Sequence, residues 1–183
     1  PTWLSITAEG IDTNDVVTSQ IDNIWYFAGG AFSGTPVAGL KETVLFRSTA
    51  DSQLVDGMMA NLSPESALKD FKASGTEYAL AIRLMGKFKT AFPEGKPAEK
   101  QPDDKKDPAA KSDVKQADDA LKEGKSEATV ILVGDADMIH DSFSVQDTQT
   151  PFGNMRRPLN GNLNFAQNAV EQLAGDSNLI GVR

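Results

Sequence analysis

Residues 128–143 read ATVILVGDADMIHDSF, and this stretch decides which fold the sequence predicts. It opens with a continuous apolar run, ATVILV, that is rich in β-branched side chains. Such a run is typical of a strand covered on both faces, as in a parallel sheet. At the tip of the run, Gly134 is followed by Asp135 and Asp137. The pattern therefore predicts a central strand of an α/β protein with a polar loop at its carboxyl end.

Two segments further along the chain complete this pattern. Residues 164–175 predict a helix that ends at Gly175, and residues 178–183 predict a short closing strand. The apolar face expected on the helix consists of Leu163, Ala166, Val170 and Leu173. A strand, a loop, a helix and a second strand predict a three-layer α/β/α fold with a mostly parallel sheet.

The first half of the chain adds further strands. Residues 24–27, 42–49 and 77–88 have the β-branched or alternating patterns of strands. In the last of these, one face is expected to carry Tyr78, Leu80, Ile82 and Leu84. A short helix is predicted between the second and third strands, because Ser63 is a good N-cap, Pro64 suits the first helical position and Gly75 suits the end.

A charged insertion divides this pattern. Residues 96–126 contain eight lysines, eight acidic residues and three prolines, but only Val114 and Leu121 as large apolar side chains. Such a segment buries too little apolar area to offset its chain entropy. We therefore expect a disordered insertion within one α/β domain spanning residues 1–183, with at most a transient helix over 112–123. A docking role for this charged segment is the alternative.

Composition excludes several classes of function. The chain has no cysteine, which excludes disulfides, thiolate metal sites and cysteine nucleophiles, and its single histidine excludes multi-histidine zinc sites. A net charge of −8 without a basic stripe argues against nucleic acid as a partner. No apolar run approaches the ~18 residues that span a bilayer. Because the chain begins at Pro1, we interpret it as a processed fragment.

The aspartates at the strand tip allow two interpretations. Asp135 and Asp137 could share Mg²⁺ in a hydrolase or phosphotransferase. Alternatively, Gly134 and Asp135 end the strand in a tight turn and Asp137 caps the next segment. We favour the structural interpretation, and assign no catalytic, cofactor-binding or metal-binding residue. The glycines at 29, 30 and 34 lack the lysine and the helix of a phosphate loop.

Three other residues complete a possible face for a ligand or a partner. His140 is expected to be a partly exposed loop residue, and Ser142 beside it lacks the surroundings of a nucleophile. Arg156 and Arg157 are expected in a loop, where they either receive a carboxylate or phosphate or remain solvated. The possible face therefore consists of Asp135, Asp137, His140, Arg156 and Arg157.

Three stretches together resemble one family. They are PLNGNLNFAQNAVEQLAGDSNLIGVR at 158–183, GDADM at 134–138 and YALAIRLMGKFKTAFPEGKP at 78–97. In this order they are similar to the extracytoplasmic region of GldG-like proteins, which are auxiliary components of ABC transporters associated with gliding motility. The resemblance implies a periplasmic domain of an inner-membrane protein, with a glutamine-amidotransferase-like (Rossmann-like) layout but without that chemistry or a cofactor, anchored by segments outside this chain.

The function expected from this resemblance is non-enzymatic. The domain would bind a partner protein or a ligand on behalf of transport, export or gliding motility. The expected partners are ABC transporter permease or ATPase subunits or other membrane-complex proteins, with no nucleic acid and with membrane contact only through the anchors. A spacer that holds transporter subunits apart is a third possibility.

Overall fold

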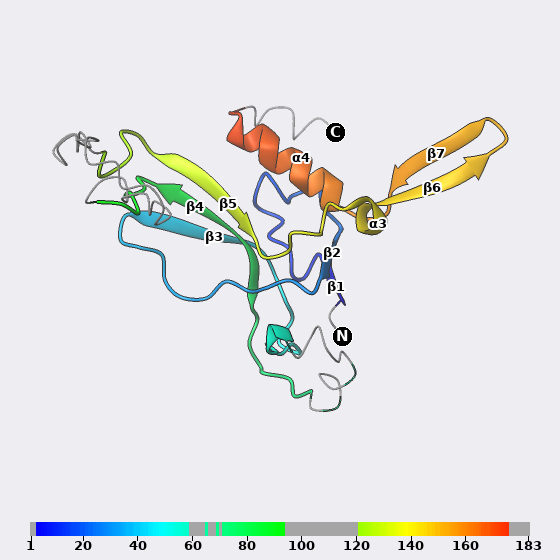
Figure 1. Ribbon diagram of the computed structural model, residues 1–183, viewed down its shortest axis with the longest axis horizontal. Coiled ribbons are helices and arrows are strands. Elements are labelled where there is room, and N and C mark those ends of the chain that lie inside the picture. The colour runs from blue at the N-terminus through cyan, green and yellow to red at the C-terminus, as the bar shows by residue number, and fades with distance from the viewer. Residues whose placement is uncertain (1–2, 59–64, 66–68, 70, 94–120, 176–183) are drawn as a thin grey trace, which may run out of the picture.

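The computed structural model describes residues 3–58, 65, 69, 71–93 and 121–175, and its strands form three small antiparallel sheets (Figure 1). The first sheet pairs β1 (Trp3–Thr7) with β2 (Asn23–Phe27). The second orders β3 (Leu40–Arg47), β4 (Ala79–Gly86) and β5 (Ala128–Val133). The third is a hairpin of β6 (Val145–Thr150) and β7 (Gly153–Pro158).

The predicted three-layer α/β/α fold with a mostly parallel, glutamine-amidotransferase-like sheet is wrong, because the strands of the described residues pair antiparallel. The error came from residues 128–133. They form β5, but β5 is an edge strand that pairs only with β4 and leaves Leu132 37% exposed. An apolar run indicates a strand, yet it does not determine which strands lie beside it.

The other strand predictions agree with the structure in position. Residues 24–27, 42–49 and 77–88 correspond to β2, β3 and β4. The sequence predicted one apolar face on β4, but the strand is buried on both faces: Leu80 and Ile82 are buried on one face and Ala81 on the other. This is what a central strand requires, because both of its faces meet other parts of the protein.

The charged insertion joins β4 to β5 and lies mostly outside the described residues. Residues close to its two ends pair with each other between β4 and β5. Lys89 pairs with Glu123, and the Thr90 N–H donates to the carbonyl of Lys122 at 2.9 Å. The insertion therefore leaves and rejoins the sheet at neighbouring points.

Two other predicted elements fall mainly outside the described residues. These are the helix from Ser63 and the closing strand at 178–183. Glu65 and Lys69 are described and are helical, whereas residues 71–74 are described and are not. Gly75 follows them with φ at +70°, a backbone conformation that glycine adopts readily.

The predicted C-terminal helix is confirmed as α4 (Asn162–Leu173), and Gly175 has the expected positive φ of +86° after its end. Its buried face was predicted wrongly. The residues that α4 buries are Asn162, Phe165, Asn168 and Ala169. In contrast, Val170 is 66% exposed and Leu173 is 49% exposed. The two buried asparagines bond to distant backbone groups, so polar contacts as well as apolar ones set the rotation of this helix.

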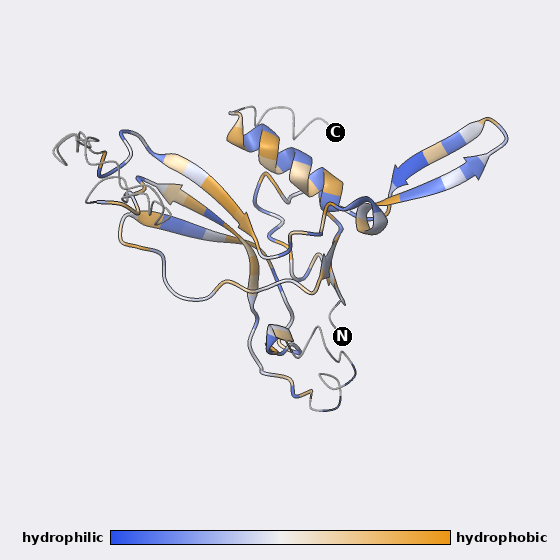
Figure 2. Ribbon diagram, in the orientation of Figure 1, coloured by the Kyte–Doolittle hydropathy of each residue, from blue (hydrophilic) through white to orange (hydrophobic). Residues whose placement is uncertain are grey.

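The core lies where β1, β2, β3 and β4 meet α4. Its members share near-complete burial and include Ile6, Ile24, Tyr26, Leu45, Phe46, Leu80 and Phe165. A buried ion pair fastens the loop before β2 to β4, since Arg83 Nη2 lies 2.6 Å from Asp15 Oδ2. Figure 2 shows apolar colour along β4 and β5 and mainly polar colour on the β6–β7 hairpin. Within the described residues, none of the helices has the length and apolar character needed to cross a bilayer.

Candidate functional site

Strand β2 has one edge paired with β1 and one edge closed by side chains. On the closed edge, the Trp25 N–H donates to Asn162 Oδ1 at 2.9 Å, and Asn162 Nδ2 donates back to the Trp25 carbonyl at 2.8 Å. Next to it, the Phe27 N–H donates to Asp135 Oδ2 at 2.7 Å. These two side chains take the place of a neighbouring strand. We call Asp135 and Asn162 the β2 clamp.

Hydrogen bonds to backbone amides hold the Asp135 side chain in this clamp. Its side chain is buried, and its second oxygen, Oδ1, accepts the Asp137 N–H at 2.8 Å. Both carboxylate oxygens thus receive backbone amides, a geometry that fixes the turn after β5. This agrees with the structural interpretation of Asp135.

Asn162 is the second member of the clamp and is fully buried. Besides its two bonds to Trp25, its Nδ2 donates to the Met138 carbonyl at 2.6 Å, and its own N–H donates to Asn160 Oδ1 at 3.0 Å. The sequence interpretation missed this role. The available signal was the NGN run at 160–162, because asparagines clustered before a helix often bond to the backbone.

A buried tyrosine lies beside the clamp. The Tyr26 hydroxyl donates to the Gly30 carbonyl at 2.5 Å, while the Gly30 N–H donates to the Gly134 carbonyl at 2.8 Å. Burial, and to a lesser extent the Asp135 carboxylate, raise the pKa of Tyr26 above its ordinary value of 10.0. A Cβ at Gly134 would collide with both the Gly30 carbonyl and the Tyr26 hydroxyl. These glycines therefore allow close packing of the backbone.

Asp137 and His140 follow the clamp on the surface. Asp137 is exposed, and it does not cap the next helix as predicted. That helix is α3 (Asp141–Ser144), and its N-cap is His140, whose Nδ1 accepts the Ser142 N–H at 3.2 Å. The prediction failed because residues 137–140 form a separate turn, closed by the His140 N–H donating to the Asp137 carbonyl. Within the described residues, no three His, Asp or Glu side chains are grouped so as to hold a metal ion.

The two arginines lie in β7 and not in a loop as predicted. Arg156 Nε and Nη2 donate to the two oxygens of Asp147 at 2.8 and 3.2 Å, and Nη1 donates to Asp141 Oδ2 at 3.1 Å. The hydrogen bond from Arg156 lowers the pKa of Asp147. Arg157 is the next residue of the strand and therefore faces the opposite side of the hairpin. The structure thus brings His140, Asp141 and Arg156 into one neighbourhood.

The β6–β7 hairpin projects away from the rest of the described chain (Figure 1). Every residue of β7 is exposed, and Phe152 at the turn is 100% exposed. The hairpin is rooted in an aromatic cluster, in which Phe143 stacks on Phe27 with ring centroids 5.1 Å apart. Trp3 packs edge-on against Trp25 in the same cluster at 5.0 Å. The exposed β6–β7 hairpin, which we call the arm, therefore extends from a packed aromatic cluster.

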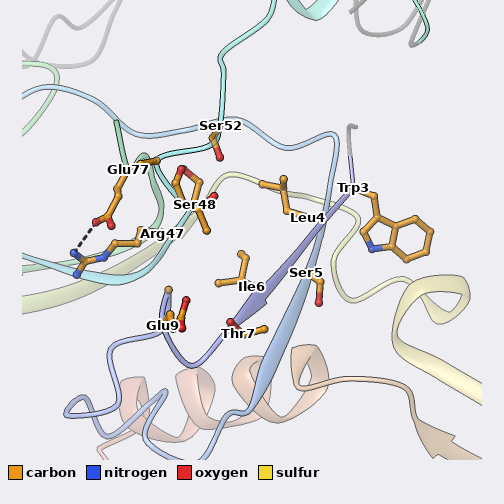
Figure 3. A pocket seen from close by; sticks show the side chains of 13 residues that line it. Trp3, Leu4, Ser5, Ile6, Thr7, Glu9, Arg47, Ser48, Ser52 and Glu77 are labelled. Atoms are coloured by element: carbon orange, nitrogen blue, oxygen red, sulfur yellow. Dashed lines mark hydrogen bonds and ion pairs between the residues drawn. The ribbon is translucent and has the colours of Figure 1, made fainter. Parts of the chain in front are cut away.

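Two cavities lie near the first sheet. The smaller, of about 350 Å³, is lined by β1 and the end of β3, and Figure 3 shows Leu4 and Ile6 at its centre. Its Arg47 and Glu77 already bind each other, with 3.4 Å between Nη1 and Oε2. The larger, of about 640 Å³, is lined in part by residues 28–31 and 51–55. None of the five residues predicted as a partner face lines either cavity.

Comparison with known proteins gives one match. A family model for auxiliary components of ABC transporters, described as "ABC-type uncharacterized transport system", matches residues 1–169. Neither the curated proteins nor the solved structures contain one that matches this chain.

Proposed function

The chain belongs to this family of ABC-type transport system auxiliary components, as its resemblance to GldG-like proteins indicated, and from that premise we propose that it is a non-catalytic module that docks a partner protein of the transport complex. Membership in the family implies association with transporter components. The proposal adds the surface that makes the contact, which is the β6–β7 hairpin.

The observation that carries this proposal is Phe152, an aromatic side chain fully exposed at the tip of a projecting hairpin. Met155 on β7 is also exposed, so the arm presents two large apolar side chains among polar ones. Aromatic residues and methionine are enriched in protein interfaces, where they fill pockets on the partner. A side chain in this position contributes nothing to the core of its own chain.

Charge on the arm favours a protein over a small ligand as the occupant. Arg156, Asp147 and Asp141 form an exposed ion cluster along the hairpin, and Arg157 lies on its other face. Such charged rims around apolar anchors set the orientation and specificity of a protein contact. Neither of the two cavities described above is lined by a residue of the hairpin.

The test is a substitution at the tip. Phe152→Ser in the full gene product is expected to lower co-purification of the transporter subunits about tenfold or more, since loss of a buried anchor costs about 2 kcal/mol or more. Phe92→Ser is the matched control, because Phe92 is also exposed but lies on another part of the chain. Equal co-purification with both variants would contradict the proposal.

We also propose that the module works on the extracytoplasmic side of the inner membrane, in transport, export or gliding motility. The resemblance to GldG-like proteins supports this location. The absence of cysteine from this chain makes the location easy to test, because Gln149→Cys on the exposed hairpin adds a thiol that the chain otherwise lacks. In intact cells, labelling by a membrane-impermeant maleimide supports the proposal, and labelling only after lysis contradicts it.

The non-catalytic role rests on the Asp135 geometry, since both of its oxygens accept backbone amides. The competing hypothesis is a Mg²⁺-dependent hydrolase or phosphotransferase that uses Asp135 and Asp137. A ligand that binds only the native state must raise the unfolding midpoint. Titration with Mg²⁺, Mn²⁺ and Ca²⁺ is therefore expected to leave the midpoint unchanged. A saturable rise that disappears in Asp137→Asn would favour the enzyme.

A further inference from the structure

We propose that the larger cavity binds a small organic cation with an apolar or aromatic body. Its volume of about 640 Å³ lies within the range of small-molecule sites. The cavity is separate from the docking hairpin, so this inference goes beyond the proposed function, and either can fail without the other.

The walls of the cavity are apolar and aromatic. Trp3, Tyr26, Phe71 and Tyr78 line it together with Leu54 and Leu80. Trp3, Leu54 and Phe71 are exposed, although each is large and apolar. With Val55, which is also exposed, four large apolar side chains in the lining of one cavity are more than scattered surface residues, and such patches mark binding sites.

The charge of the residues that line the cavity favours a cationic ligand. Among the described residues that line the cavity, Asp51 is the only one with a charged side chain, and it is acidic. No hydrogen bond or ion pair engages its carboxylate in the part of the chain that the structure describes. An anion would meet this carboxylate without a compensating cation from the described lining residues, whereas an ammonium group would be attracted to it.

Several other polar groups of the lining already have hydrogen-bond partners. Ser48 Oγ accepts the Tyr78 N–H at 3.0 Å and donates to the Thr49 carbonyl at 3.1 Å. Gln53 Oε1 accepts the Lys72 N–H at 2.7 Å. Asp51 adds a carboxylate that can orient a bound cation. The aromatic rings add a second attraction, since the faces of Trp and Tyr bind cations.

The turn at residues 28–31 shapes one wall of the cavity. Ala28 has φ at 47°, the one positive value among the described non-glycine residues. Gly29 follows it, and a Cβ there would collide with the Tyr26 ring. Hydrogen bonds on either side hold this turn, from Phe27 to Asp135 and from Gly30 to Gly134. A strained backbone held by its surroundings is typical of binding sites.

The experiment compares three probes that share one body: 2-phenylethyltrimethylammonium, 2-phenylethanol and 2-phenylethanesulfonate. Binding to the purified chain is measured by calorimetry and by the fluorescence of its tryptophans. We expect the cation to bind about tenfold more tightly than the alcohol, as one favourable charge contact would produce. We expect no binding of the sulfonate. Equal affinity for all three probes, or no binding of the cation at millimolar concentration, would overturn the inference.

Three variants locate the binding. Asp51→Asn is expected to lower the affinity for the cation toward that for the alcohol, and Phe71→Ala to weaken the binding of both. Glu77→Gln is the matched control, because Glu77 lines only the smaller cavity and should leave both affinities unchanged. Loss of cation preference in Glu77→Gln but not in Asp51→Asn would contradict the assignment.

Discussion

The β1–β2 ribbon and the β6–β7 hairpin are both two-stranded antiparallel pairs, yet they occupy opposite environments. In the first, Ile6, Ile24 and Tyr26 are buried, and the outer edge of β2 is closed by the clamp. In the second, every residue of β7 is exposed and no residue belongs to the core. The same local structure is therefore held by tertiary contacts in one case and by cross-strand pairs in the other.

Because the two pairs differ in burial, their polar residues have different roles. Asp135 and Asn162 satisfy buried backbone groups, so their substitution is expected to destabilise the fold and not to change a surface. Arg156 and Asp147 lie on solvent-exposed strands, where ion pairs contribute little to stability. Their substitution is expected to change the surface and leave the fold intact. The predictions below test this contrast, from the largest effect to the smallest.

Asn162→Ala is expected to cause the largest loss. It leaves the Trp25 N–H and the carbonyls of Trp25 and Met138 without partners in a buried region. Each unsatisfied group costs about 1–3 kcal/mol, so we expect a loss of roughly 3 kcal/mol or more in the free energy of unfolding. Urea denaturation measures it. Asn154→Ala on exposed β7 is the control and should change stability by less than about 0.5 kcal/mol.

Gly134→Ala should destabilise by about 1–3 kcal/mol, because the added methyl group collides with the Gly30 carbonyl and the Tyr26 hydroxyl. Thermal unfolding measures the change. At Gly57 a Cβ would meet no atom within 4 Å, so Gly57→Ala tests whether the collision itself is responsible. Similar losses in the two variants would show that the packing around Gly134 is looser than described.

Tyr26→Phe should cost about 1 kcal/mol, since the Gly30 carbonyl loses its donor. The pH dependence gives a second readout. Because the pKa of Tyr26 is raised in the folded state, the neutral phenol is favoured there, and this stability is lost as the pH rises above the ordinary value of 10.0. Wild-type stability should therefore fall more steeply above pH ~10 than that of Tyr26→Phe. Parallel curves would contradict the buried phenol.

Arg156→Gln should have the smallest effect on stability, but it should raise the pKa of Asp147. The hydrogen bond from Arg156 lowers the pKa of Asp147 below 3.8. A depressed carboxyl pKa stabilises the folded state above the unfolded value, and this contribution is lost as the pH falls through the folded value. Carboxyl NMR should show the Asp147 pKa returning toward 3.8 in Arg156→Gln. Arg157→Gln should leave it unchanged.

Local patterns predicted the elements better than their arrangement. The strands β2, β3, β4 and β5 and the helix α4 all lie close to the predicted segments. Their partners were wrong, because the alternation in 77–88 and the apolar run in 128–133 report burial and not the identity of the neighbour. The β4–β5 pair was hidden by the charged insertion, which separates the two strands by a long stretch of sequence.

The candidate site was predicted in part. Asp135 was correctly interpreted as a structural turn residue, but its bond to Phe27 joins residues 108 positions apart, and no local pattern reports such a contact. For the same reason Asn162 was missed and the buried face of α4 was rotated away from Phe165. Arg156 was recognised as a surface cation, but its partner Asp147 depends on hairpin pairing that was not predicted, and its partner Asp141 lies in α3.

The bond between Thr90 and Lys122 closes the base of the β4–β5 hairpin, so whatever lies between these residues begins and ends at one place on the sheet. Each doubling of a loop's length adds only about 0.6 kcal/mol to the cost of closing it. Homologues can therefore lengthen or shorten this segment with little effect on strand register. The same position is a natural splice point for an epitope tag or a fluorescent protein, which would report on the module without altering the clamp or the arm.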